Sequence, residues 1–416
     1  MVCAGLCQPK GKKMVNRPDY DVVVVGGGPA GSTAAYLLGE FGHRVALLEK
    51  QTYPRDKACG GCLSQKSVRF LDRVFSAPVP ALRQEGLIDF TGTAYALYIG
   101  SNHALAGDLA EPFYFTRRDR YDAYLARRAA EAGAEVHEGV EVTAVDHAGR
   151  TVTTSEGDCY SAPVFIGADG IHSRVRRSFP ESVVDRERWQ KNLGLALELV
   201  IPREELRAPT CGGGPIRMEG DLATPHLFFA ACRWGYGWVF PNRDAIVVGI
   251  GGLYRKNGKS LRDRFGEFLD SIGLSAFADQ RPMGFPLPFG NYIPSPVHEG
   301  ALLVGDAGGF ASPILGEGIF YAHRTAELAA HAIHRHLTTE APLAETYTAL
   351  LRRRLIPELR AETALRDFLY GCLDARMRIP LEVFMKTTSA RVIDAVQGFR
   401  SFLGFQQDDE LHTAVW

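Results

Sequence analysis

The feature that most constrains this chain is an apolar strand that runs directly into a glycine-rich turn. After Tyr20 the sequence reads DVVVVGGGPAGSTAAYLLGEFGHRVALLEK. This pattern predicts a strand at 22–25, a helix that ends near residues 39–42, and a second strand that closes on Glu49. The order strand, glycines, helix, strand and acid is typical of the first unit of an α/β dinucleotide-binding domain.

Each glycine of this turn has a separate physical task. Gly26 allows the tight turn, Gly28 lets backbone amides approach a pyrophosphate, and Gly31 lets the helix pack closely on the strand. The helix N-terminus adds positive potential for the phosphates. Glu49, 23 residues after the first glycine, is placed to accept hydrogen bonds from a ribose hydroxyl. The sequence therefore predicts a dinucleotide site, with a purely structural glycine turn as the alternative.

Two later segments indicate which dinucleotide binds. Residues 164–177 read VFIGADGIHSRVRR and residues 301–320 read ALLVGDAGGFASPILGEGIF, so an apolar strand ends in a glycine and an aspartate each time. The turn after the second strand opens a helix whose free amides can face the negative end of a reduced flavin. An extended cofactor, FAD, fits these segments, and the residues expected to contact it are Asp169, Gly305, Asp306, Pro313, Gly316 and Gly318.

These three segments together resemble a known superfamily. GGGPAG, GADGIHSRVR and GDAGGFASPILGEGI are similar to the three FAD fingerprints of the p-hydroxybenzoate hydroxylase superfamily, which holds aromatic monooxygenases, flavin halogenases and geranylgeranyl reductases. The resemblance implies a Rossmann-like FAD domain interrupted by a substrate-binding sheet domain. FTRRDRYDAYLARRAAEAGAEV resembles the segment in which an arginine precedes a helix. It implies that Arg118 contacts FAD, while Arg117 and Arg120 are solvated.

The middle of the chain has the texture of an antiparallel sheet. Between Pro180 and Pro288, the runs LGLALELVI, HLFFAACRWGYGWVFP and AIVVGIGGL are short and partly alternating. The stretch GYGWVFP places Tyr236, Trp238 and Phe240 on one face of a strand. These aromatic rings are either ordinary core or the lining for a large hydrophobic ligand.

Two cysteines bracket a glycine pair in KACGGCLS, at residues 57–64. Structural zinc needs a second pair of ligands at similar spacing, so we expect no metal here. A loop of this kind, together with GYGWVFP and SPILGEGIF, resembles the geranylgeranyl reductases, whose signature joins a Lys-x-Cys-Gly-Gly loop to a Tyr-x-Trp-x-Phe-Pro strand. The resemblance places the loop beside the isoalloxazine ring. It implies an active site with Cys59, Tyr236 and Trp238 as catalytic wall residues, and with substrate contacts at Gly60, Gly61 and Phe240.

The role of Cys59 stays open at this point. Its thiol could donate a proton to a reduced alkene, form a reversible disulfide with Cys62, or simply be small enough to fit. The eight cysteines are scattered through a long chain, which argues against a disulfide scaffold.

The expected architecture is an α/β FAD-binding domain with an α+β insert and a helical C-terminal region. Four parts follow from the motifs: a loose tail, a discontinuous FAD domain, a sheet domain for the substrate, and the C-terminal helices. The tail is 1–17, and the FAD domain comprises 18–75, 110–180 and 288–337. The sheet domain comprises 76–109 and 181–287, and the C-terminal helices occupy 338–416.

The predicted function is an FAD-dependent reductase that passes a hydride to a carbon–carbon double bond of an isoprenoid. The main alternative is a monooxygenase that hydroxylates an aromatic substrate through a C4a-hydroperoxide. That substrate would be a small aromatic compound or a tryptophan within a peptide. A non-catalytic flavin or electron-transfer protein is a third possibility. GIGGLYRKNG, at 249–258, has no apolar helix after its glycines, so we interpret it as a strand edge. Any NAD(P)H must then bind transiently, or a carrier protein must deliver electrons.

The remaining expectations concern partners and location. A formal net charge of -1 provides no general attraction to nucleic acid. No apolar run reaches transmembrane length, and the basic stretch in the first residues follows their apolar ones, unlike a secretory signal. We expect a cytoplasmic protein with a hydrophobic or aromatic substrate, and the apolar patches after Pro342 suggest capping of the substrate tunnel or peripheral membrane contact.

Overall fold

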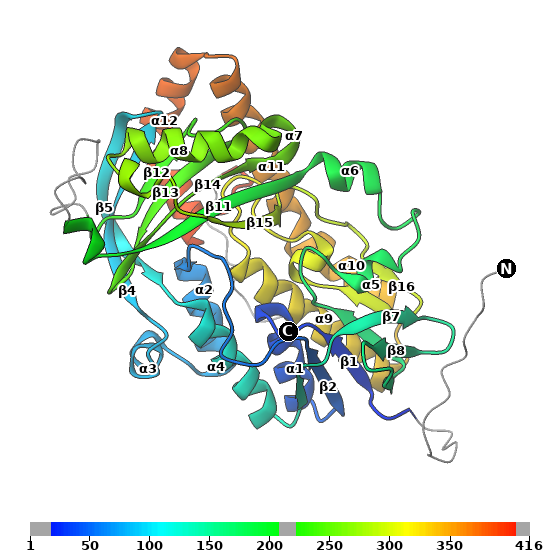
Figure 1. The fold of residues 1–416 in the computed structure, drawn as a ribbon. Coiled ribbons are helices and arrows are strands. Elements are labelled where there is room, and N and C mark those ends of the chain that lie inside the picture. The colour runs from blue at the N-terminus through cyan, green and yellow to red at the C-terminus, as the bar shows by residue number, and fades with distance from the viewer. Residues whose placement is uncertain (1–17, 208–221, 405–416) are drawn as a thin grey trace.

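Two sheets set the architecture of this computed structural model, which describes residues 18–207 and 222–404. Figure 1 shows a parallel sheet flanked by helices in the lower part of the molecule and a large curled sheet in the upper part. The long helix α9 (Ile319–Thr339) lies in the lower part and packs against α1 (Pro29–Glu40). The predicted fold class, a Rossmann-like α/β domain with an antiparallel sheet domain and C-terminal helices, is confirmed.

The nucleotide end is built on a six-stranded sheet in the order β16-β17-β10-β1-β2-β6. Strand β1 pairs in parallel with both β2 and β10, so the three strands end at the same edge. The strands of this sheet are β1 (Val22–Val25), β2 (Val45–Glu49), β6 (Glu135–Glu138), β10 (Val164–Gly167), β16 (Val297–His298) and β17 (Ala301–Leu303). A separate three-stranded sheet contains β7 (Val142–Asp146), β8 (Thr151–Thr154) and β9 (Cys159–Ser161).

The second large sheet has eight strands in the order β15-β11-β14-β13-β12-β4-β5-β3. Its members are β3 (Cys62–Leu63), β4 (Phe90–Ile99), β5 (Asn102–Phe115), β11 (Leu193–Pro202), β12 (His226–Phe229), β13 (Gly235–Pro241), β14 (Ala245–Leu253) and β15 (Met283–Pro288). The segment 249–258 was interpreted as a strand edge, and this was wrong for residues 249–253. Strand β14 lies inside the sheet between β11 and β13, because its glycines make room for the ring of Trp238.

The helices cover the parallel sheet and continue to the C-terminal end. Their bounds are α1 (Pro29–Glu40), α2 (Gln65–Phe75), α3 (Val79–Gln84), α4 (Arg118–Glu131), α5 (Arg174–Arg177), α6 (Arg186–Lys191), α7 (Tyr254–Asn257), α8 (Leu261–Ser271), α10 (Leu343–Arg354), α11 (Ile356–Asp374) and α12 (Arg378–Gln397). Helix α9 is buried along most of its length, which explains why it carries so many alanines.

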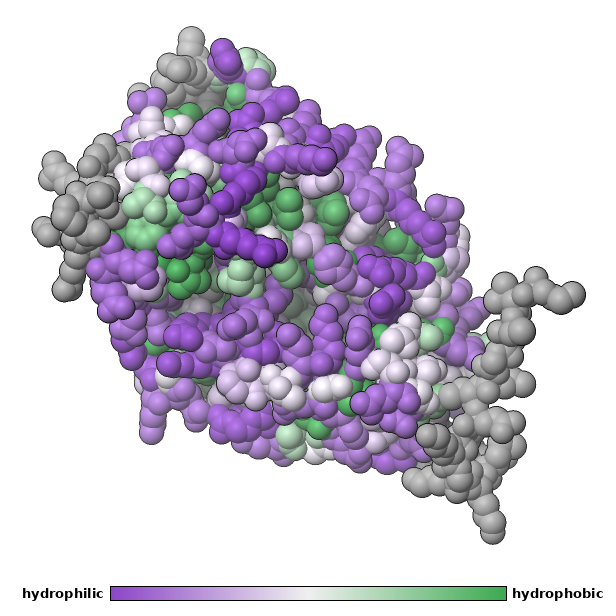
Figure 2. All heavy atoms as spheres, in the orientation of Figure 1, coloured by the Kyte–Doolittle hydropathy of each residue, from purple (hydrophilic) through white to green (hydrophobic). Residues whose placement is uncertain are grey.

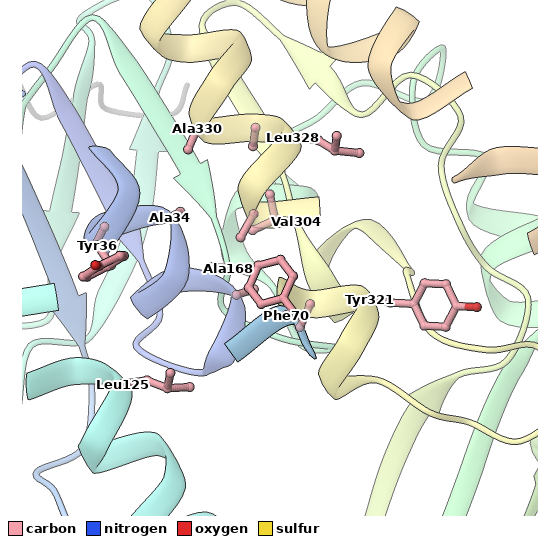
Figure 3. Close-up of a cluster of buried hydrophobic side chains, with 14 of the residues drawn as sticks. Ala34, Tyr36, Phe70, Leu125, Ala168, Val304, Tyr321, Leu328 and Ala330 are labelled. Carbon is pink, nitrogen blue, oxygen red and sulfur yellow. The ribbon is translucent and has the colours of Figure 1, made fainter. Parts of the chain in front are cut away.

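The core under the nucleotide turn joins helices from distant parts of the chain. Figure 3 shows side chains of this core, among them Phe70 of α2, Val304 after β17 and Tyr321 in the first turn of α9. Deeper in the same core, the two ring nitrogens of His323 lie 2.7 Å from Thr33 Oγ1 and 2.7 Å from Tyr121 Oη. Burial lowers the pKa of His323 to about 3, so the ring is neutral and can link α1, α4 and α9 without a buried charge.

The surface of the molecule is mostly polar on the face seen in this orientation. Figure 2 shows a mostly hydrophilic face, with hydrophobic residues visible between charged side chains over the large sheet in its upper half. Within residues 18–207 and 222–404, none of the helices combines the length and the apolar character needed to cross a bilayer.

Candidate active site

The glycine turn after β1 has the geometry that a dinucleotide requires. Gly26 has a φ of +100°, in the region where side chains are strained. A Cβ on Gly31 would overlap the carbonyl oxygen of Gly26, so the close approach of α1 to the turn depends on this glycine. By contrast, the nearest atom to a Cβ on Gly28 is 3.9 Å away, in the side chain of Arg55. The turn is tight on its protein side and open on the side where a pyrophosphate would bind.

Glu49 ends β2 beside this turn, as predicted. Its Oε2 accepts the backbone N–H of Gly27 at 2.8 Å, and its Oε1 accepts that of Gln51 at 3.0 Å. Arg55 lies 3.5 Å from the same carboxylate. These contacts hold Glu49 in one orientation, and the carboxylate lines the cavity described below.

Asp122 and Arg55 connect Arg118 to Glu49, and neither residue was singled out from the sequence. Arg118 donates two hydrogen bonds to Asp122, at 2.8 and 2.9 Å, and Arg55 approaches the same carboxylate at 3.1 Å. Although burial opposes the charge, Asp122 and Cys59 raise the pKa of Arg118 above its ordinary value. The guanidinium is therefore a fixed cation at the cavity wall, while Arg117 and Arg120 are exposed as expected.

The two later aspartates lie on the opposite side of the turn. Asp169 Oδ2 accepts the backbone N–H groups of Arg174 at 2.6 Å and Val175 at 3.3 Å, while its Oδ1 is buried without a partner. Burial raises the pKa of Asp306, and the cations Lys57 and Arg118 oppose this shift. A buried carboxylate oxygen that lacks a donor is a natural acceptor for a ligand hydroxyl or a bound water.

One continuous cavity of about 700 Å³ connects these groups. It reaches from the β1–α1 turn to the aromatic face of β13. The predicted site residues that line it are Gly26, Gly28, Glu49, Cys59, Gly60, Gly61, Arg118, Asp169, Tyr236, Trp238, Phe240, Asp306, Gly316 and Gly318. Three others, Gly31, Gly305 and Pro313, do not line it. The open turn, the carboxylate at the ribose position and the buried aspartates together fit FAD.

The cysteine loop and the aromatic strand meet in this cavity. A Cβ on Gly60 would lie 2.7 Å from Phe240 Cδ2 and 3.6 Å from Trp238 Nε1, so the loop backbone packs directly on these rings. Cys59 Sγ accepts the backbone N–H of Gly61 at 3.4 Å. Cys59 and Cys62 are both free thiols, and burial raises the pKa of the Cys62 thiol well above its usual value.

Tyr236, Trp238 and Phe240 form the lining that was one of two alternatives for this strand. Their ring centroids are 5.8 Å and 6.4 Å apart in succession, and all three side chains face the cavity. The Tyr236 hydroxyl donates a hydrogen bond to the carbonyl of Leu315, which ties the strand to the loop before α9. Trp238 Nε1 is buried without a partner.

Three acids in the cavity wall, Glu141, Glu198 and Glu317, were not singled out from the sequence. Glu198, on β11, shares its face with Gly194 and Ala196, and burial raises the pKa of its carboxyl. Its carboxylate accepts the backbone N–H of Cys59. Glu317 lies between Gly316 and Gly318. Glu198 alternates with the small residues Gly194 and Ala196 along β11. This pattern in the sequence could have indicated an acid that faces a cavity.

A further acid, Glu362 on α11, is fully buried. It accepts hydrogen bonds from the hydroxyls of Ser312 and Tyr321. Burial raises the pKa of Glu362 from 4.5 to about 7, against the opposing effect of Lys66. Because the folded pKa exceeds the unfolded one, this carboxyl stabilises the fold fully below pH 4.5 and loses that contribution as pH rises through 7.

We therefore expect a pH-dependent difference in stability between the wild type and Glu362→Gln. A shift from 4.5 to about 7 corresponds to about 3 kcal/mol. The free energy of unfolding of the wild type, minus that of the variant, should fall by roughly this amount between acid and neutral pH. Urea unfolding across this pH range measures it. Glu156→Gln, in an exposed turn, is the control, and a wild-type minus Glu362→Gln difference that is constant with pH would contradict the assignment.

Comparisons with known proteins agree with this geometry. Residues 19–199 match the family model described as an FAD binding domain. A geranylgeranyl diphosphate reductase from Rhodobacter capsulatus is 30% identical over 335 residues, which cover 78% of this chain and 77% of that protein. This chain belongs to the geranylgeranyl reductase family of FAD-dependent oxidoreductases.

Two other proteins, one compared by sequence and one by structure, are also similar to this chain. A menaquinone reductase from Mycolicibacterium smegmatis is 29% identical over 334 residues, covering 74% of this chain and 75% of that protein. The crystal structure of a geranylgeranyl bacteriochlorophyll reductase-like protein from Thermoplasma acidophilum matches with a TM-score of 0.72 and 21% identity. It covers 91% of this chain and 96% of that one, and it supports the fold.

Proposed function

We propose that this protein uses FAD to reduce carbon–carbon double bonds of an isoprenoid compound. The observation that carries the proposal is the single cavity that joins the dinucleotide turn to an apolar chamber. The names of two relatives point to a geranylgeranyl diphosphate and a menaquinone as their substrates, and both compounds are isoprenoids. A hydrophobic substrate of this class therefore agrees with the family and with the chamber.

The chamber continues beyond the aromatic strand along an apolar wall. Strands β4, β5 and β12 provide Tyr95, Leu97, Phe113 and Leu227, and helix α12 adds Val396. The contact by Val396 agrees with the expectation that the C-terminal region caps the substrate tunnel. A long flexible hydrocarbon chain gains most from such a wall, because each buried CH₂ contributes about 0.8 kcal/mol.

The residues of the chain have separable tasks in this reaction. The N-terminus of α1 would hold the pyrophosphate of FAD, Glu49 its adenosine ribose, and Asp306 a hydroxyl of its ribityl chain. Bound FAD, once reduced, supplies the hydride. Trp238 and Phe240 exclude water from the reacting double bond and hold it against the cysteine loop.

The electron donor belongs to the same proposal. Transient NAD(P)H or a donor protein would reduce the flavin.

Apolar side chains on the C-terminal helices, Phe368 at 43% exposed and Val383 at 57% exposed, are available for peripheral contact with the membrane that holds a lipid substrate.

The test separates this reductase from a monooxygenase. The FAD-loaded protein is reduced with dithionite without oxygen and then mixed with a geranylgeranyl compound, and the flavin absorbance is followed. Reoxidation that forms a product with two added hydrogens is the expected result. The monooxygenase is supported instead if the alkene leaves the flavin reduced and oxygen produces a hydroxylated aromatic product.

Cys59→Ala is expected to keep FAD and to lower the rate of flavin reoxidation by the alkene by no more than about tenfold. The thiol packs at the cavity wall next to Arg118 and receives the N–H of Gly61, so its removal alters shape more than chemistry. Stopped-flow absorbance measures the rate. A fall of 10² or more, as removal of a general acid produces, would make the thiol itself the proton donor.

A further inference from the structure

Glu317 presents a carboxylate to the cavity and is held from behind by Lys66 of α2 and by Ser64, the residue that precedes this helix. Its Oε1 accepts the hydroxyl of Ser64 at 2.6 Å, and its Oε2 lies 2.6 Å from Lys66 Nζ. The Lys66 side chain is 2% exposed, and that of Glu317 is 14% exposed. An ammonium so deeply buried is expensive to retain for stability alone, since replacing a buried ion pair by apolar groups often leaves stability unchanged.

Lys66 also connects the cavity to the buried acid Glu362. Its Nζ is 5.1 Å from the centroid of the Tyr321 ring, and the Tyr321 hydroxyl donates to Glu362. Ser312 forms a second link, because its hydroxyl donates to Glu362 and its backbone N–H donates to the carbonyl of Glu317. Lys66 lies close enough to oppose the rise in the pKa of Glu362, so the two carboxyl groups act on one ammonium.

We propose that Glu317 donates the proton that completes reduction of the double bond, and that Lys66 and Glu362 act through it as positioning residues that restore this proton. The inference rests on the proposed function, since it names the acid for that same reaction. Glu317 is suited to the task because it combines a place at the cavity wall with a hydrogen-bonded connection to further proton-carrying groups.

The step balances in atoms and electrons. The hydride and its two electrons come from the reduced flavin and form one new C–H bond. The π electrons of the alkene form the second C–H bond with the proton of Glu317, whose O–H bond breaks to leave a carboxylate. The proton of Glu317 comes from the Lys66 ammonium, 2.6 Å from its Oε2, so the resting ion pair becomes a neutral acid and amine before the transfer. Lys66 then regains a proton that Glu362 releases. The cluster then takes up one proton from water before the next turnover.

Glu198, another acid in the wall, is less suited to this task. The carboxylate of Glu198 already accepts the backbone N–H of Cys59, and the charged groups that act on it are the cations Lys57 and Arg118. These contacts fix the cysteine loop. They connect Glu198 to no second acid, whereas Glu317 has Glu362 behind it.

The first experiment compares Glu317→Gln with the wild type in anaerobic flavin reoxidation by a geranylgeranyl compound. The variant should bind FAD with an unchanged spectrum and accept electrons from dithionite, yet reoxidise at least 10² more slowly, the usual effect of losing a general acid. Glu156→Gln is the matched control and should behave as the wild type. A Glu317→Gln rate within threefold of the wild type overturns the proposal.

The second experiment needs no alkene. The charged and titratable groups that face Glu362 are Lys66 from α2, Glu317 from the loop before α9, and Tyr321 from α9, with Ser312 as a further hydrogen-bond partner. Infrared difference spectra of reduced minus oxidised protein should contain a protonated-carboxyl band that titrates near neutral pH. The band should be absent in Glu362→Gln.

The two experiments separate the inference from the proposed function. If no isoprenoid alkene reoxidises the wild-type flavin, the proposed substrate class is wrong, and the infrared band still decides whether the acid cluster exchanges protons with the site. If the band is missing from the wild type, or persists in Glu362→Gln, the relay is overturned even when the alkene is reduced. A band lost in Glu362→Gln, with slow reoxidation in Glu317→Gln, supports it.

Discussion

Replacing Gly31 by alanine is expected to give a colourless protein whose affinity for FAD is at least 100-fold weaker. The new methyl group would overlap the carbonyl oxygen of Gly26, a backbone atom that cannot rotate away. Helix α1 must then retreat from the turn, which removes its N-terminal amides from the position of the pyrophosphate. We also expect a loss of about 1–3 kcal/mol in the free energy of unfolding, as for other overpacked sites.

The matched control is Gly371→Ala on helix α11. Both glycines lie inside helices, where alanine is favoured by about 1 kcal/mol, but a Cβ on Gly371 has no atom within 4 Å. Gly371→Ala should therefore keep its yellow colour and gain slight stability. FAD titration followed by fluorescence quenching measures both proteins. If Gly31→Ala binds FAD as tightly as the control, the close helix approach is not what holds the cofactor.

The parts of the fold that depend on local sequence order were predictable. The strand at 22–25, the glycine turn and the strand that ends on Glu49 are neighbours in the chain, and each is specified by residue types that have few other uses. The one-sided aromatic pattern on β13 was also predictable, because strand alternation places side chains by position alone.

The arrangement of the substrate sheet was less accessible. The segment 249–258 was interpreted as a strand edge, because no apolar helix follows its glycines. In the folded protein, Gly249 and Gly251 make room for the ring of Trp238 on the neighbouring strand. That requirement depends on which strands pair, and pairing between segments is not visible in either segment alone.

The acid cluster was missed for a related reason. Lys66 and Glu317 are separated by about 250 residues in the chain, and Glu362 follows on another helix. None of the three lies in a motif that demands its charge. Their meaning comes from burial, because a carboxylate and an ammonium in a dry interior need one another, whereas the same residues on a surface would be unremarkable.

The contact between the cysteine loop and the aromatic strand should be measurable as a coupling energy. A Cβ on Gly60 would lie 2.7 Å from Phe240, so Gly60→Ala must displace either the loop or the ring. We expect Gly60→Ala to slow flavin reoxidation by the alkene about 10- to 100-fold, because the cavity wall moves relative to the double bond. Phe240→Ala removes the obstructing ring.

A double-mutant cycle identifies the cause of the loss. In Gly60→Ala with Phe240→Ala, the rate should recover relative to Gly60→Ala alone, with an interaction energy of about 1–2 kcal/mol. Gly266→Ala, at a half-buried position of α8 with no described atom within 4 Å of its Cβ, is the control and should couple to Phe240→Ala by less than about 0.5 kcal/mol. If the effects of Gly60→Ala and Phe240→Ala are additive, the loop and the aromatic strand act independently. A shared cavity wall would then not explain why this chain carries both motifs.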